Sequence, residues 1–214
     1  MMGRSIVGIA GSLGRPSRTR ALVEAAVERA SARYLLDGAV FDLLSFSPSL
    51  GSATRLSDLD ADARASVDTM LEADALVLAS PVYKGSYSGL FKHLIDLLDP
   101  QSLVGKPVLI GATGGGPRHA LVIEHQLRPL LGFFEAQTLA TGIYAAELDF
   151  EQGAIASPAA LERLDRAVGQ FAPFLDAPMP LQVVDPGSTS LRGDAACASA
   201  PSVAWRGGHA CSNG

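Results

Sequence analysis

The sequence predicts an α/β fold in which five parallel strands form one sheet, in the spatial order 2-1-3-4-5, with helices on both faces. Short apolar segments alternate with amphipathic ones between residues 6 and 175, as expected for repeated strand–helix units. The apolar segments are hydrophobic almost throughout, which indicates strands buried on both faces of a sheet. Loops rich in glycine and hydroxyl side chains follow the first, third and fourth strands, at the edge where such sheets bind ligands.

Hydrophobic periodicity places the individual elements. Strands are expected at 6–10, 39–42, 75–79, 107–112 and 137–144. Helices are expected at 20–32, 58–73, 90–98, 117–134 and 158–175. Residues 43–57 are expected to form a loop, after which Ser57 or Asp58 caps the second helix. Five strands in this order correspond to a flavodoxin-like fold.

Composition indicates a globular domain rather than a disordered chain. Of the 214 residues, 48% are hydrophobic and 18% are charged. The net charge of −5 argues against a nucleic-acid partner. The helical and strand patterns stop near residue 175, so we expect one domain at 1–175 and a C-terminal arm with a flexible tail at 176–214.

Other features favour a cytoplasmic protein that has no membrane or metal contact. The chain starts almost directly on a strand, which leaves no room for a signal peptide, and no apolar run approaches the roughly 18 residues of a membrane span. Cys197 and Cys211, the only cysteines, both lie in the tail, as suits a reducing compartment. The spacing of His119, Glu124 and His125 matches no zinc motif, so no metal site is predicted.

The loop between the first strand and the first helix is a candidate phosphate site. Backbone N–H groups and the positive end of the helix dipole meet there. Ser12, Ser17 and Thr19 add hydroxyl groups, and Arg18 adds a positive charge. In the alternative interpretation, Ser17 only caps the helix. The Walker pattern is absent and the glycine spacing does not fit the dinucleotide motif, so a mononucleotide is favoured.

Two further loops suit a flat heterocyclic ring. Residues 80–89, with the binding candidates Pro81, Val82, Tyr83, Lys84 and Gly85, offer backbone groups for a pyrimidine edge. The alternative is an ordinary loop with surface tyrosines. The second loop, Thr113-Gly114-Gly115-Gly116, lets a ring approach the backbone closely. A phosphate site beside two such loops indicates flavin mononucleotide (FMN).

Pro129 predicts an irregularity in the fourth helix. Proline has no N–H, so the carbonyl four residues earlier, that of His125, loses its helical partner. A kink or a one-residue bulge near His125 follows.

These motifs together resemble the NAD(P)H-dependent FMN reductases, and most closely those that serve two-component alkanesulfonate and methanesulfonate monooxygenases. The resemblance extends from about residue 6 to residue 175. It implies that Ser12, Ser17, Arg18 and Thr19 hold the FMN phosphate. It further implies that residues 81–85 hold the ribityl and pyrimidine parts, and that residues 113–116 lie beside the isoalloxazine.

The same resemblance implies hydride transfer from NADH or NADPH to FMN, which then leaves for a separate flavin-dependent monooxygenase. The choice of nicotinamide stays open. The resemblance also implies a π-helix at His125 in the interface of a tetramer or dimer, and an acidic residue, Asp96, that bridges subunits. Tyr87 is a further interface candidate. The alternatives are an FMN-containing quinone or azo reductase and a flavodoxin-type electron carrier.

Overall fold

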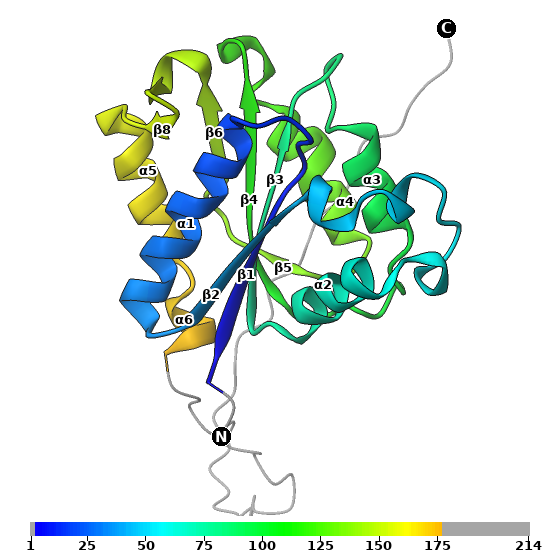
Figure 1. Cartoon of the computed structure of the whole chain (residues 1–214). Coiled ribbons are helices and arrows are strands. Elements are labelled where there is room, and N and C mark those ends of the chain that lie inside the picture. The colour runs from blue at the N-terminus through cyan, green and yellow to red at the C-terminus, as the bar shows by residue number, and fades with distance from the viewer. Residues whose placement is uncertain (1–2, 177–214) are drawn as a thin grey trace, which may run out of the picture. The chain divides into compact units, whose positions relative to one another are not determined.

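The central sheet has the predicted strand order. The computed structural model describes residues 3–176, and the predicted tail lies outside these residues except for Asp176. Figure 1 shows the parallel strands, which run in the order β2-β1-β3-β4-β5. Their bounds are Ser5–Ala10 (β1), Asp37–Asp42 (β2), Ala75–Pro81 (β3), Pro107–Gly114 (β4) and Gln137–Thr138 (β5).

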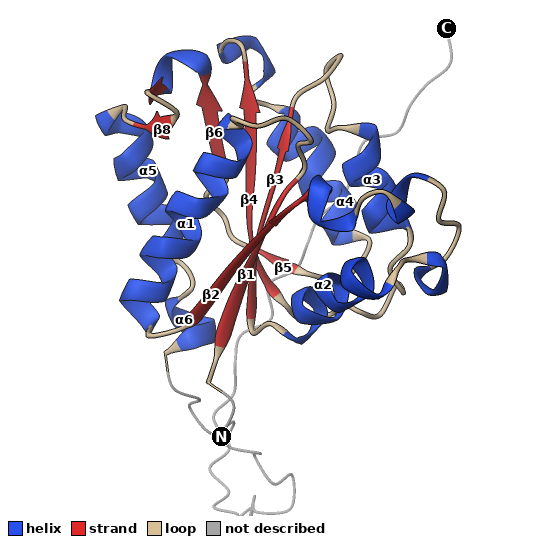
Figure 2. Ribbon diagram, in the orientation of Figure 1, coloured by secondary structure: helices blue, strands red, loops and turns tan. Residues whose placement is uncertain are grey.

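Helices cover both faces of this sheet, as predicted. α1 (Arg18–Tyr34) and α5 (Pro158–Gly169) lie on one face, and α2 (Ala61–Glu72), α3 (Gly89–Asp96) and α4 (Arg128–Gly132) lie on the other (Figures 1 and 2). Each face of the sheet buries its own hydrophobic cluster. In the part of the chain that the structure describes, no helix is both long and apolar enough to cross a membrane.

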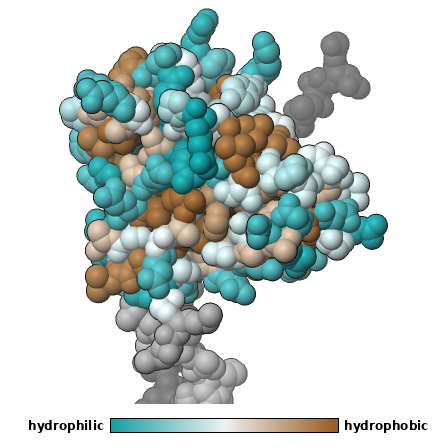
Figure 3. All heavy atoms as spheres, in the orientation of Figure 1, coloured by the Kyte–Doolittle hydropathy of each residue, from teal (hydrophilic) through white to brown (hydrophobic). Residues whose placement is uncertain are grey.

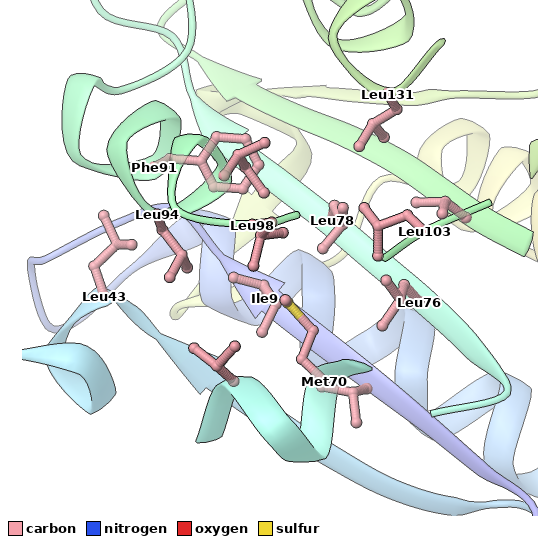
Figure 4. Packing of buried hydrophobic residues seen from close by; sticks show 14 of the residues in the cluster. Ile9, Leu43, Met70, Leu76, Leu78, Phe91, Leu94, Leu98, Leu103 and Leu131 are labelled. Atoms are coloured by element: carbon pink, nitrogen blue, oxygen red, sulfur yellow. The ribbon is translucent and has the colours of Figure 1, made fainter. Parts of the chain in front are cut away.

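The helices pack closely against both faces of the sheet. On the α1 face, a Cβ at Gly8 would lie 2.3 Å from Val23 Cγ1, so glycine lets α1 approach β1 closely. On the other face, Ile9 and Leu78 point toward Phe91 and Met70 (Figure 4). The loops at the strand ends are therefore mounted on well-packed elements.

The fifth strand is not continuous, which corrects the prediction of one strand at 137–144. β5 and β6 (Ile143–Ala146) both pair with β4, and the chain between them leaves the ladder. The Arg128 guanidinium donates to the carbonyl oxygens of Leu139 (2.9 Å) and Ala140 (3.3 Å). Arg163 Nε donates to the Gly142 carbonyl at 2.8 Å. These side chains take the acceptors that a continuous strand would use.

The predicted loop at 43–57 is more ordered than expected. Three short helices occupy most of it, and they bury Phe46 and Leu50 in the core. These helices are η1 (Leu43–Phe46), η2 (Ser49–Gly51) and η3 (Leu56–Asp58). The cap of α2 is Asp60, which accepts the Ala63 N–H at 2.9 Å, rather than Ser57 or Asp58. Asp58 Oδ2 instead accepts the amide of Thr54.

Two differences also occur near the end of the described chain. The last predicted helix breaks at Gln170, where α5 ends before a short α6 (Ala172–Leu175). An antiparallel pair, β7 (Phe150–Glu151) and β8 (Ala154–Ile155), precedes α5 and was not predicted.

The fourth helix has the bulge that Pro129 predicts. A short 3-10 turn, η4 (Pro117–His119), leads into a π-helical segment, η5 (Ile123–Leu127), which continues as α4. The Arg128 N–H donates to the carbonyl of Ile123, five residues earlier. His125 therefore lies in a segment in which one extra residue is inserted into the helix, shortly before Pro129.

A buried carboxylate fixes the loop that follows β1. Asp42, at the end of β2, has a side chain only 3% exposed. Its Oδ2 accepts hydrogen bonds from Arg15 Nη2 (2.7 Å) and from Arg20 Nη1 (3.0 Å). Burial on its own would raise the pKa of Asp42, but the two arginines outweigh burial and hold that pKa below its ordinary value. The loop is thus attached to β2 by an ionised carboxylate.

We predict that Asp42→Asn destabilises the protein by about 1–2 kcal/mol at pH 7. Because the folded pKa of Asp42 is lowered, its contribution is complete above the unfolded value and is lost as pH falls through the folded one. The difference in the free energy of unfolding between wild type and variant should therefore shrink below about pH 4. Urea unfolding at several pH values measures it. Asp68→Asn, in the exposed pair with Arg64, is the control. A difference that does not change with pH would contradict this role.

Candidate functional site

A pocket of about 270 Å³ lies at the carboxyl edge of the sheet. It is formed by the loops after β1, β3 and β4, the segments that the sequence singled out. Its lining residues are Ser12, Gly14, Pro16, Ser17, Arg18, Thr19, Pro81, Val82, Tyr83, Thr113, Gly114 and Gly115. The structure thus brings together most of the predicted binding residues, but Lys84, Gly85 and Gly116 do not line this pocket.

The loop before α1 presents hydroxyl groups to the pocket. Ser17 caps α1, since its Oγ accepts the Arg20 N–H at 3.1 Å. The same Oγ lies 2.7 Å from Ser12 Oγ. Ser17 therefore caps the helix, as one of the two interpretations of the sequence expected, and it also lines the pocket. Its role as a phosphate ligand stays a prediction.

Backbone amides at the start of α1 are also available to a ligand. The first amides of a helix have no partner within the helix. Ser17 supplies acceptors for Arg20 and Ala21, whereas within residues 3–176 the amides of Arg18 and Thr19 donate to no protein acceptor. These two N–H groups, in the positive end of the helix dipole, suit an anion.

Hydrogen bonds hold the three loops to one another. Thr19 Oγ1 lies 2.6 Å from Thr113 Oγ1, and both side chains are buried. Ser88 Oγ donates to the Gly11 carbonyl at 2.7 Å. The Val82 N–H donates to the Thr113 carbonyl at 2.8 Å. The Thr19 hydroxyl is therefore hydrogen-bonded to Thr113, while its amide has no acceptor within residues 3–176.

The loop after β3 folds back on itself. Tyr83 and Ser86 exchange backbone hydrogen bonds, with Tyr83 N to Ser86 O at 2.9 Å. The two residues between them, Lys84 (φ 53°) and Gly85 (φ 86°), have the left-handed conformation of a tight hairpin turn. This turn explains why Lys84 and Gly85 lie beyond the pocket while Tyr83, 60% exposed, stands at its rim.

The loop after β4 leaves space that the protein does not fill. A Cβ at Gly115 or Gly116 would meet no atom within 4 Å, and neither residue has a positive φ. Nothing inside the described chain thus demands glycine at these positions. At Gly114, by contrast, a Cβ would lie 2.2 Å from the hydroxyl of Tyr144, which donates to the Gly116 carbonyl at 2.5 Å.

Tyr144 and Glu147 are site residues that sequence reasoning missed. Tyr144 lies in β6, and Glu147 comes directly after it. The carboxyl end of β6 meets the same edge of the sheet. Burial, followed by the charge of Asp149, raises the pKa of Tyr144, which keeps the hydroxyl protonated as a donor. Glu147 Oε1 lies 2.9 Å from Arg18 Nη1. The position of Tyr144 at the end of a predicted strand was the one available signal.

The predicted interface residues lie outside the pocket. His125 is exposed on η5, and Asp96 is exposed and pairs with Lys92. Tyr87 is half-buried and packs against Phe91, with ring centroids 6.3 Å apart. A hydrogen bond of 3.1 Å from Ser86 Oγ to Gln126 Oε1 nevertheless connects the loop after β3 to η5.

The donor set of this pocket fits FMN. Two serine hydroxyls and two unpaired amides suit the acceptor oxygens of a phosphate monoester. The space beside Gly115 and Gly116 suits a planar ring that approaches the backbone. The surface view in Figure 3 shows separate hydrophobic patches among hydrophilic side chains.

Comparison with known proteins agrees with this geometry. The family model described as "NADPH-dependent FMN reductase" matches residues 4–151. The NADH-dependent FMN reductase SfnF of Pseudomonas putida is 43% identical over 175 residues, which cover 81% of this chain and 94% of that protein. The FMN reductase (NADPH) of Escherichia coli is 35% identical over 89% of this chain and 98% of that protein.

Among solved structures, the apo form of the NADH:FMN oxidoreductase EMOB matches with a TM-score of 0.72 and 31% identity. The match covers 82% of this chain and 92% of that structure. The oxidised flavodoxin 2 of Bacillus cereus shares the fold, with a TM-score of 0.56 and 13% identity. The match covers 79% of this chain and 98% of that structure. The family model and the relatives that are 35% or more identical show that the chain belongs to the NADPH-dependent FMN reductase family.

Proposed function

We propose that this FMN reductase binds FMN in the pocket at the carboxyl edge and releases it, reduced, to a separate flavin-dependent monooxygenase. The pocket carries the proposal, because it combines phosphate donors at α1 with open space at Gly115 and Gly116. The serine hydroxyls of Ser12 and Ser17 and the amides of Arg18 and Thr19 would hold the phosphate. The backbone of 81–83 and 113–116 would lie along the ribityl chain and the ring.

Hydride transfer from NADH or NADPH to N5 is the chemistry that the flavin supplies when bound. The chain's own residues orient the ring and leave one face open to the nicotinamide. Tyr83 stands exposed at the pocket rim, where it can contact either ring system. Tyr144 keeps the 113–116 backbone in place through the Gly116 carbonyl. We assign no residue of this chain to proton transfer.

We further propose a cytoplasmic tetramer or dimer and a partner of the alkanesulfonate or methanesulfonate monooxygenase type. The motif resemblance supports both, and the similarity to the NADH-dependent FMN reductases SfnF and SfnE supports the partner. His125 and Tyr87 would lie at the subunit interface, with Asp96 bridging subunits. The exposed apolar side chains of Leu121 (64%) and Phe133 (68%), on either side of η5 in the sequence, support an interface there.

The first prediction from the proposed function concerns the phosphate site. The double variant Ser12→Ala/Ser17→Ala should raise the FMN KM about tenfold or more, because two hydroxyl donors to a charged group are lost. Steady-state kinetics on protein purified without added flavin, with FMN varied under NADH and under NADPH, measures this. Saturation by added FMN in wild type is also expected. Asp60→Ala, which removes the α2 cap outside the pocket, controls for the lost helix cap. An unchanged FMN KM would place the phosphate elsewhere.

The second prediction concerns the open space at Gly115. Gly115→Val should leave the thermal midpoint close to that of wild type, since its Cβ meets no protein atom within 4 Å. The same side chain would occupy ring space, so FMN affinity should fall about tenfold or more. Gly51→Ala, also in open space but outside the pocket, is the matched control. Normal FMN titration by Gly115→Val would show that the ring does not lie here.

The third prediction concerns the extra residue of the π-helical segment. Deleting His125 should restore regular helical pairing between Arg128 and Ile123. It would also move Gln126, which is hydrogen-bonded to Ser86 beside the pocket. We expect altered assembly in sedimentation and slower flavin release.

His125→Ala keeps the residue count and should retain the wild-type behaviour if the insertion, rather than the imidazole, matters. Unchanged assembly and flavin release in the deletion variant would refute the interface proposal.

A further inference from the structure

The arginines around the phosphate loop are all paired with carboxylates of the chain itself. Arg15 and Arg20 share Asp42, and Arg20 also contacts Glu24 at 2.8 Å. Arg18 pairs with Glu147 at 2.9 Å. Three positive charges therefore face three negative ones next to a site for a phosphate that carries nearly two negative charges. A group of paired charges attracts an anion less strongly than three unpaired arginines would.

Arg18 is the arginine of this group that lines the pocket. A second cavity of about 320 Å³ adjoins it, and Pro16, Ser17, Arg18 and Glu147 lie in its wall. The Arg18–Glu147 pair thus stands at the boundary between the two cavities. Its side chains are 40% and 69% exposed, so the pair can open without disturbing the core.

Glu147 is held in position by its own backbone. It begins the short turn η6 (Glu147–Asp149) that follows β6. Asp149 Oδ2 accepts the Ala146 N–H at 2.8 Å, and the Asp149 carbonyl accepts the Ala156 N–H at 2.8 Å. The turn therefore aims one carboxylate at Arg18 while neighbouring groups fix the backbone.

We propose that Glu147 competes with the flavin phosphate for Arg18 and so lowers the affinity for FMN and speeds its release. This inference rests on the proposed function. When the phosphate enters, the Arg18 guanidinium turns from Glu147 to the phosphate, and the Arg18–Glu147 pair opens. The loss of this ion pair costs binding free energy. Glu147 is a positioning residue that acts through Arg18, and it sets how long the flavin stays.

The test is Glu147→Gln, which keeps the size of the side chain and removes the charge. Because the pair is exposed, we expect FMN to bind about two- to fivefold more tightly, with a matching decrease in its dissociation rate. Flavin fluorescence titration and stopped-flow dissociation measure these quantities. Riboflavin, which lacks the phosphate, should bind the variant and the wild type equally. Glu151 is an exposed carboxylate on β7, so Glu151→Gln is the charge-matched control. It should change the affinity for neither FMN nor riboflavin.

A double-mutant cycle with Arg18→Gln separates the pairing from a general field effect. In the Arg18→Gln background, Glu147→Gln should no longer tighten FMN binding. The inference is wrong if Glu147→Gln still tightens FMN binding in the Arg18→Gln background, or if Glu151→Gln tightens FMN binding as well. It is wrong, too, if Glu147→Gln tightens riboflavin binding as much as FMN binding. It is also wrong if Glu147→Gln changes nothing while Ser12→Ala/Ser17→Ala weakens FMN, in which case the proposed function stands. If neither variant affects FMN binding, both proposals fail.

Discussion

The parallel register of β1, β3 and β4 is the constraint on which the pocket depends. Ala10 lies level with Ala79, and Ala79 lies level with Gly111, so the carboxyl ends of the three strands meet at one edge. The ladder continues into the loops, since Gly11 N donates to the Ala79 carbonyl and Val82 N donates to the Thr113 carbonyl. The pocket is therefore an extension of the sheet, and its backbone donors are fixed before a ligand arrives.

Sequence patterns were sufficient for the parts of the fold that local chemistry determines. The buried strands appear as uninterrupted apolar segments because parallel sheets are covered on both faces. The strand order followed from the alternation of elements. An irregularity near His125 was predictable because Pro129 removes one specific hydrogen bond, and the family resemblance implied that it is π-helical. The three loops that line the pocket were likewise predictable from their content of glycine and hydroxyl side chains.

What the sequence could not predict are the contacts between distant residues. The fifth strand breaks because Arg128 and Arg163 reach its carbonyl groups from other elements. Lys84 is turned away from the pocket by a two-residue hairpin whose geometry depends on Tyr83 pairing with Ser86. Arg18 pairs with Glu147, which follows β6 and is more than 120 residues away in the sequence. No local sequence pattern connects the two residues.

These distant carboxylates change what the phosphate loop can do. A loop and helix start with three arginines, Arg15, Arg18 and Arg20, would on sequence alone be expected to hold an anion strongly. Because Asp42 and Glu147 already neutralise Arg15 and Arg18, the remaining attraction comes from amide and hydroxyl dipoles. Dipoles of this kind select a phosphate by geometry and lose their hold within a short distance, unlike an unpaired charge. Under the proposed function, such a pocket would orient the flavin and still let it go, which are the two demands on a reductase whose flavin must leave.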